Sequence, residues 1–119
     1  MCEIIEINGV KYSPLSEQAK SVDGLTPVLI RSYAAGVHFG LLEKEEFTIS
    51  GKVVVLRNTR RVWSWKKAAS LSQIAIDGVG EGSKIAMALD YNEIVNVIET
   101  IPLTETAFKN LKNHPEWKS

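Results

Sequence analysis

The chain has 119 residues, 45% of them apolar and 24% charged, and we expect it to form one soluble globular domain over residues 1–119. Its formal net charge is zero, which argues against a protein that coats long nucleic acid, because such proteins carry a marked basic excess. The only cysteine, Cys2, excludes an intrachain disulfide. Neither a signal-peptide pattern nor an apolar run of about 20 residues is present, so we expect an intracellular protein with no membrane partner.

The first part of the chain predicts short strands joined by turns. Residues 3–13 predict a β-hairpin, because the pair Asn8-Gly9 accepts the positive φ angles of a type I′ turn. Alternation of side-chain types then predicts strands over residues 28–34 and 37–43.

Glycines interrupt the strand pattern in the middle of the chain. Gly36 and Gly40 predict a bend, a bulge or a close backbone approach. Residues 43–52 predict a turn at Ser50-Gly51, and residues 52–58 predict a buried strand. Strands bent at glycines and linked by short turns indicate a small curled antiparallel sheet or partial barrel.

Two helices are predicted in the second half. Apolar spacing predicts the first from Ala68 up to Gly78, a typical residue just past a helix C-terminus. Thr104 is a suitable N-cap for the second, over residues 105–113. Between them we expect strands over residues 84–89 and 93–103. The fold class is therefore α+β, with the curled sheet packed against two short helices.

A turn is expected over residues 90–92, between these last two strands. The glycine-rich stretch 78–83 is either a simple connector or a loop that closes over a ligand.

Positive charge is concentrated in mid-chain. Six of the fourteen basic residues lie between Phe47 and Ile76, whereas all fourteen acidic residues lie outside this window. The window ends in the first predicted helix, whose N-terminus also favours anions. Guanidinium groups bind phosphates and indole rings stack on bases, so the window predicts a site for a small phosphorylated ligand with an aromatic ring.

Each member of the window also has a structural alternative. Arg57, Arg60 and Arg61 either coat the rim of a sheet or hold a phosphate, and we favour ligand contact because no acidic residue nearby in sequence offsets their repulsion. Trp63 and Trp65 either stack on a base or fill the core between sheet and helix. One buried and one solvated indole is also consistent with the pattern.

Evidence for catalysis is slight. His38 lies beside glycines in a predicted strand and is a candidate ligand contact, but a single histidine makes no triad. No metal-binding motif or acidic pair is present, so we expect no metal, no cofactor and no catalytic residue. Tyr91 and Asn92 are either turn residues or ligand contacts, because an amide can read an adenine edge.

Three blocks of the sequence resemble a family of phage proteins. They are RSYAAGVHFG at residues 31–40, TRRVWSWKKAASLSQIA at residues 59–75 and ETIPLTETAFKNLKNHPEW at residues 99–117. They are similar to the first described phage anti-defence proteins that counter Thoeris immunity by sequestering its cyclic ADP-ribose signal.

The resemblance implies a sponge and not an enzyme. Its ligand is a cyclic ADP-ribose-type molecule or a cyclic nucleotide, bound in the cytoplasm of the infected bacterial host. The resemblance also implies a homo-oligomer, a dimer or an assembly of dimers, with pockets at subunit contacts. Arginines hold the phosphates, and aromatic or apolar side chains hold the adenine. Because the 78–84 loop is polar and glycine-rich where an apolar contributor is expected, Ile85 or Met87 takes that role.

Residues and resemblance together give one set of expected ligand contacts. These are Arg31, His38, Arg57, Arg60, Arg61, Trp63, Trp65, Ile85, Met87, Tyr91 and Asn92. Two other functions stay open: a small nucleic-acid-binding phage protein and, with less support, a hydrolase of the same signal. Binding to nucleic acid predicts a steep loss of affinity with salt, and a hydrolase predicts products where a sponge returns the intact molecule.

Overall fold

The computed structural model of the protein describes residues 5–7, 10–12, 18–49 and 51–117. Near the N-terminus, β1 (Ile5–Ile7) and β2 (Val10–Tyr12) pair in antiparallel fashion. This pairing confirms the hairpin predicted over residues 3–13, although its Asn8-Gly9 turn lies outside the described residues.

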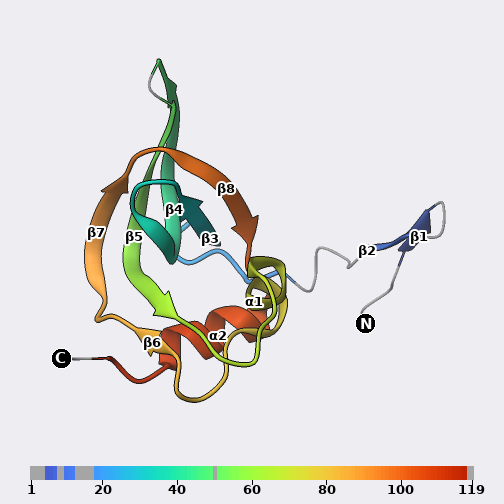
Figure 1. Cartoon of the computed structure of the whole chain (residues 1–119). Coiled ribbons are helices and arrows are strands. Elements are labelled where there is room, and N and C mark those ends of the chain that lie inside the picture. The colour runs from blue at the N-terminus through green and yellow to red at the C-terminus, as the bar shows by residue number, and fades with distance from the viewer. Residues whose placement is uncertain (1–4, 8–9, 13–17, 50, 118–119) are drawn as a thin grey trace.

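The main sheet has six antiparallel strands and curls into a half-barrel (Figure 1). The strands are β3 (Thr26–Ser32), β4 (Gly36–Thr48), β5 (Gly51–Ser64), β6 (Lys84–Ile85), β7 (Leu89–Ile94) and β8 (Val97–Pro102). Their order is β6-β5-β4-β3-β8, and β7 pairs with a different part of β5. Figure 1 shows β7 and β8 arching from one side of the sheet to the other. The predicted α+β fold with a curled antiparallel sheet is confirmed.

The sheet has two apolar faces because side chains alternate along each strand. On the inner face of the curl, Val28 and Ile30 of β3 pack with Leu56 of β5 and Ile94 of β7. The opposite, outer face carries Leu29 of β3 and packs against the helices. The inner cluster is therefore separated by the sheet from the cluster that the helices cover.

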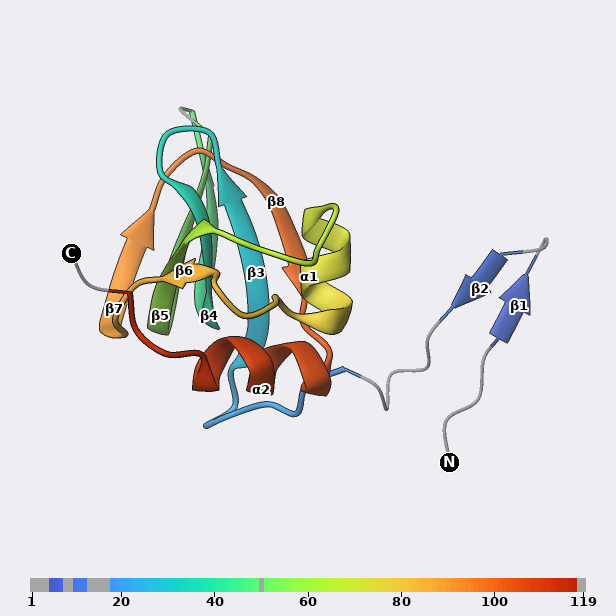
Figure 2. The same ribbon diagram turned by 60° about the horizontal axis from the view of Figure 1, so that its bottom comes forward.

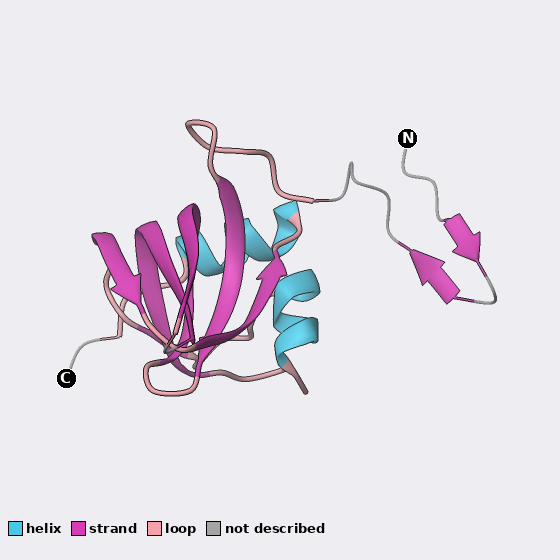
Figure 3. Cartoon of the chain, turned by 90° about the horizontal axis from the view of Figure 1, so that it is seen from above, coloured by secondary structure: helices cyan, strands magenta, loops and turns pink. Residues whose placement is uncertain are grey.

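Two helices cover the outer face. The helix α1 (Leu71–Asp77) follows β5, and α2 (Glu105–Asn113) follows β8; both belong to the outer core (Figure 3). Figure 2 shows α2 crossing below the strands, with α1 beside β8. None of the described helices is long and apolar enough to cross a membrane.

Local capping signals set the helix ends. The side chain of Ser70 accepts a hydrogen bond from the Gln73 amide at the start of α1, and Gly78 follows its last residue with φ 82°. The Thr104 side chain accepts from the Ala107 amide at the start of α2. The predicted helix stop at Gly78 and the predicted N-cap at Thr104 are confirmed.

Two predicted turns are strands in the structure. Most of the 43–52 segment continues β4 and β5, where Phe47 pairs with Lys52. Residues 90–92 lie inside β7, where Tyr91 pairs with Arg57 of β5. The 90–92 prediction was wrong, and the predicted 43–52 turn was too long, because strand pairing extends as far as Thr48 and Gly51. Hydrogen bonds to a neighbouring strand override local turn preference in both segments. The predicted 93–103 strand is divided at Asn96, which has φ 54°.

Candidate ligand-binding site

A cavity of about 290 Å³ opens on the inner face, and we call it the inner pocket. Strands β4 and β5 and the segment 86–92 supply its lining: His38, Thr59, Arg61, Trp63, Ala86, Met87, Leu89 and Asn92. Ile30 pairs with His38, and His38 pairs with Arg61. Because directly paired residues share a face of a sheet, this pocket continues the face that carries the inner apolar core.

Arg61 and Trp63 form the cationic and aromatic part of the inner pocket. The guanidinium carbon of Arg61 lies 3.9 Å from the centroid of the Trp63 ring. Arg61 is half-buried and Trp63 is 51% exposed. None of the described carboxylates forms an ion pair with Arg61. Its hydrogen-bond donors therefore remain available to an anionic ligand.

The β3–β4 turn lies close to the guanidinium of Arg61. Gly36 has φ 81°, and a side-chain carbon at this position would lie 3.3 Å from Nη2 of Arg61. The Ser32 hydroxyl accepts a hydrogen bond from the Ala35 amide at 3.1 Å and donates to the Val95 carbonyl at 2.6 Å. The positive φ favours glycine here, and a side chain at this position would also push the guanidinium aside by a few tenths of an ångström.

His38 lies against the same turn. Its Nε2 atom is 2.9 Å from the carbonyl oxygen of Ala35. Burial lowers the pKa of His38 below its ordinary value of 6.5, and the positive charge of Arg61 lowers it further, although the hydrogen bond to Ala35 opposes both effects. The ring is therefore neutral at neutral pH, and the positive charge of the pocket lining comes from Arg61.

The structure brings five of the predicted contact residues together in the inner pocket: His38, Arg61, Trp63, Met87 and Asn92. Three further lining residues were not among the expected contacts: Thr59, Ala86 and Leu89. A signal for Thr59 was present, because it precedes Arg61 and Trp63 by two and four residues on one strand and so shares their face. Ala86 and Leu89 carry no local signal of this kind.

Arg57 and Tyr91 lie outside the inner pocket. Nε of Arg57 is 3.0 Å from Oε2 of Glu43, and its guanidinium lies 5.5 Å from the centroid of the Tyr91 ring. The expectation that no acidic residue relieves the arginines is therefore wrong for Arg57, because the sheet brings Glu43 from β4 beside it.

Arg60 is a structural residue in this fold. It is 5% exposed and its guanidinium donates to the carbonyl oxygens of Leu111 at 2.9 Å and His114 at 2.8 Å, at the end of α2. Its Nε donates to the carbonyl of Ala86 at 2.7 Å. Burial lowers the pKa of Arg60, which Glu116 opposes. Its donors satisfy carbonyl oxygens at the C-terminal end of α2, and Arg60 does not line the inner pocket.

The remaining predicted contacts also lie elsewhere. Ile85 is fully buried in the outer core, and Trp65 packs against that core. Arg31 is exposed on β3 and does not line the inner pocket. Trp63 is thus the solvated indole and Trp65 the packed one, because β5 ends at Ser64 and the alternation of faces ends with it. The arginines of the window lie on β5, nine or more residues before the α1 N-cap at Ser70, so the helix N-terminus does not form their site.

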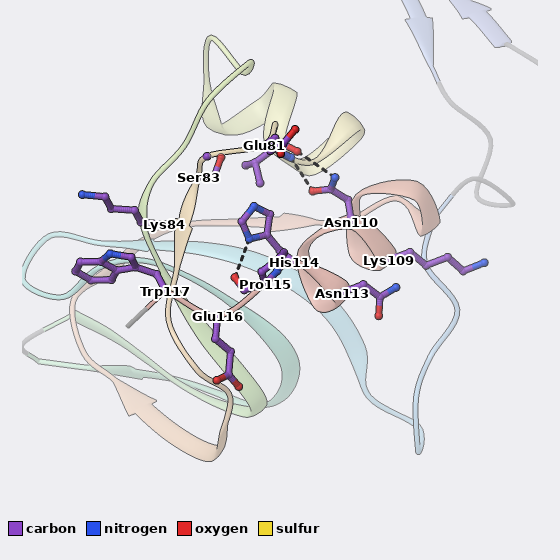
Figure 4. A pocket seen from close by; sticks show the side chains of 12 residues that line it. Glu81, Ser83, Lys84, Lys109, Asn110, Asn113, His114, Pro115, Glu116 and Trp117 are labelled. Carbon is purple, nitrogen blue, oxygen red and sulfur yellow. Dashed lines mark hydrogen bonds between the residues drawn. The ribbon is translucent and has the colours of Figure 1, made fainter. Parts of the chain in front are cut away.

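A larger and shallower groove of about 890 Å³ lies between the end of α2 and the glycine-rich loop (Figure 4). Its polar groups are largely engaged: the Asn110 side chain bonds both the amide and the carbonyl of Val79, at 2.8 and 3.0 Å. Trp117 at its edge meets Trp63 with ring centroids 6.0 Å apart, and Nζ of Lys84 lies 5.2 Å from the Trp117 ring. Residues of the glycine-rich loop line this groove, and none of them lines the inner pocket.

Comparison with known proteins gives one match. A family model described as a domain of unknown function, DUF6948, matches residues 25–111. This stretch contains every residue that lines the inner pocket. No curated protein and no solved structure matches the chain.

Proposed function

We propose that this chain, which belongs to the DUF6948 family, binds a small phosphorylated molecule with an aromatic ring in the inner pocket and releases it unchanged. The observation that carries the proposal is the Arg61 guanidinium held over Trp63 without a carboxylate partner among the described residues. A phosphate satisfies the free donors of Arg61 by charge-assisted hydrogen bonds. The exposed indole offers a stacking surface to the ring.

Asn92 supports recognition of a heteroaromatic ring. Its side chain lines the inner pocket and has no hydrogen-bond partner among the described residues. An amide presents a donor and an acceptor side by side, which matches the edge of a purine such as adenine. Met87 adds an adaptable apolar contact at the same wall.

The lining favours retention over cleavage. His38 is the pocket-lining side chain that titrates nearest to neutral pH, and no carboxylate joins it in that lining. Hydrolysis of a phosphate ester or a glycosidic bond draws on an acid and a base placed on opposite sides of the scissile bond. The inner pocket offers one uncharged imidazole, whose Nε2 is engaged with Ala35.

The sequence resemblance narrows the proposal to a phage sponge for cyclic ADP-ribose-type signals, acting in the cytoplasm of the infected bacterial host. Two of the resembling blocks, 31–40 and 59–75, supply His38, Thr59, Arg61 and Trp63 to the pocket lining. The cavity of about 290 Å³ is just below the usual range for small-molecule sites, roughly 300–1,000 Å³. A cavity of this size in one chain leaves room for a second subunit to complete the site, which supports the proposal of a homo-oligomer.

Thermal-shift measurements test the binding proposal with four probes: ADP, cyclic ADP-ribose, adenosine and inorganic phosphate. A ligand at 100 times its Kd stabilises the native state by about 2.7 kcal/mol. We expect ADP or cyclic ADP-ribose to raise the melting temperature more than adenosine or phosphate does, because only the first two offer both a ring and a phosphate. The proposal fails if neither of them changes the melting temperature.

The fate of the ligand separates a sponge from an enzyme. Protein is incubated with the stabilising ligand and then heated, and the supernatant is analysed by chromatography. We expect the intact molecule, and recovery of linear products would establish the hydrolase alternative. A steep fall of affinity for a single-stranded oligonucleotide between 50 and 200 mM salt, with no binding of the small ligands, would instead establish nucleic-acid binding.

A further inference from the structure

The hydrogen bond of His38 determines which of its ring nitrogens carries the hydrogen. Nε2 lies 2.9 Å from the carbonyl oxygen of Ala35, and a carbonyl oxygen only accepts. Nε2 therefore carries the hydrogen. Burial and Arg61 keep the pKa of the ring low, so the ring is neutral and its Nδ1 is an unprotonated acceptor.

This acceptor is open to the inner pocket. His38 is only 5% exposed, and the described residues provide no partner for Nδ1. Every fully buried polar side-chain atom in the described part of the chain has a hydrogen-bond partner, so Nδ1 must reach accessible space. Since His38 lines the inner pocket, that space is the pocket.

Thr59 is a second buried polar residue of the same lining. Its hydroxyl donates to the carbonyl oxygen of Phe39 at 2.9 Å and the residue is 1% exposed. The hydrogen of this hydroxyl is committed, so toward a ligand Oγ1 is left with its lone pairs. Both residues lie at the buried base of the lining, whereas Trp63 and Met87 are about half exposed at its rim.

We infer that the buried floor of the inner pocket recognises sugar hydroxyls, so that the protein selects ribonucleotides over deoxyribonucleotides. This inference rests on the proposed function and specifies the ligand class of the same site. A phosphate does not suit the floor, because phosphate oxygens and the two floor atoms are all acceptors. A ribose hydroxyl is a donor and satisfies the unpaired acceptor, His38 Nδ1, while Arg61 and Trp63 hold the phosphate and the ring.

Loss of the hydroxyl leaves a desolvated acceptor unpaired. A site built to hydrogen-bond a hydroxyl rejects an analogue that lacks it more strongly than an apolar pocket rejects a missing methylene. The unpaired acceptor costs about 1–3 kcal/mol, which corresponds to roughly 5-fold to 150-fold in affinity. The preference for ribose is therefore large enough to measure by titration.

Calorimetric titration of the full chain with ADP, 2′-deoxy-ADP and 3′-deoxy-ADP tests the inference. We expect at least one deoxynucleotide to bind about tenfold or more weakly than ADP. In His38→Phe, which removes the acceptor, the difference between ADP and that deoxynucleotide should shrink. Circular dichroism verifies that the variant is folded, and the comparison in the unmodified protein stands without it.

The possible outcomes distinguish the claim of hydroxyl recognition from the claim of nucleotide binding. Equal affinities for all three nucleotides in the unmodified protein would overturn hydroxyl recognition and leave nucleotide binding intact. Tighter binding of both deoxynucleotides than of ADP would also overturn it, because the floor would then prefer an apolar sugar edge. If none of the three binds while the chain is folded, the proposed nucleotide-type function is overturned and the hydroxyl site with it.

Discussion

Nη1 of Arg60 lies 2.9 Å from the carbonyl oxygen of Leu111, so a strand residue caps a helix 51 positions further along the chain. The next residue, Arg61, points to the opposite face of β5 and has no such partner. Helix C-termini leave carbonyl oxygens unsatisfied, and a buried guanidinium supplies several donors at once. Two adjacent arginines therefore serve two purposes, one structural and one available to a ligand.

Replacing Arg60 should destabilise the fold. Arg60→Ala leaves the carbonyls of Leu111 and His114 without their donor, and we expect the free energy of unfolding to fall by about 2–4 kcal/mol. Urea denaturation followed by tryptophan fluorescence measures the change. Arg57→Ala is the matched control, because its exposed ion pair with Glu43 contributes less than about 1 kcal/mol. Equal effects of the two substitutions would contradict the structural role.

Replacing Arg61 should weaken ligand binding and leave the fold intact. Arg61→Ala removes the cation of the inner pocket, and loss of charge-assisted hydrogen bonds of about 1.5–3 kcal/mol predicts roughly 10-fold to 150-fold weaker binding of ADP or cyclic ADP-ribose. Arg57→Ala, outside the inner pocket, should retain the unmodified affinity. Calorimetry on both variants checks this. Placement of the site on Arg61 fails if Arg57→Ala alone loses affinity.

Stability should depend on pH through His38. Its folded pKa is lowered by burial and by Arg61, so as pH falls below about 6.5 the unfolded chain takes up a proton more readily than the native protein. The contribution of neutral His38 is fully present above that pH and is lost as pH falls toward the folded pKa. Denaturation curves from pH 7.5 to 5 should show a smaller decline for His38→Gln, which does not titrate. If stability falls equally with pH in the unmodified protein and in His38→Gln, His38 is not the source of the pH dependence.

Gly40 should be intolerant of a side chain. A methyl group there would lie 3.0 Å from the carbonyl oxygen of Arg57 and 3.0 Å from Cβ of Thr59. Because backbone atoms cannot move aside cheaply, we expect Gly40→Ala to lower the free energy of unfolding by about 1–3 kcal/mol. Chemical denaturation measures this. Gly24→Ala is a useful comparison, since nothing lies within 4 Å of the added carbon and only the strain of φ 80° remains. A smaller loss at Gly40 than at Gly24 would show that β4 and β5 separate to admit the methyl group.

Signals that act over a few residues were readable from the sequence. The N-cap at Thr104, the helix stop at Gly78 and the bend at Gly36 each depend on backbone conformation within one turn of chain. The sequence also brought forward His38, Arg61 and Trp63, which share the inner pocket. Charge and aromatic rings concentrated in one stretch selected Arg61 and Trp63, and His38 was selected as a lone histidine beside glycines in a predicted strand.

Pairing between distant strands decided the rest. The sequence alone did not separate Arg57, Arg60 and Arg61, because their surroundings come from Glu43, from the end of α2 and from the inner face respectively. Residues 43–52 and 90–92 have turn-like composition but gain strand hydrogen bonds from partners elsewhere in the chain. Helix propensity and capping depend on residues that are close together in the sequence, so they can be read from it. Strand register, side-chain burial and the charges that face each other across strands depend on residues far apart in the sequence, and they are set only when the sheet forms.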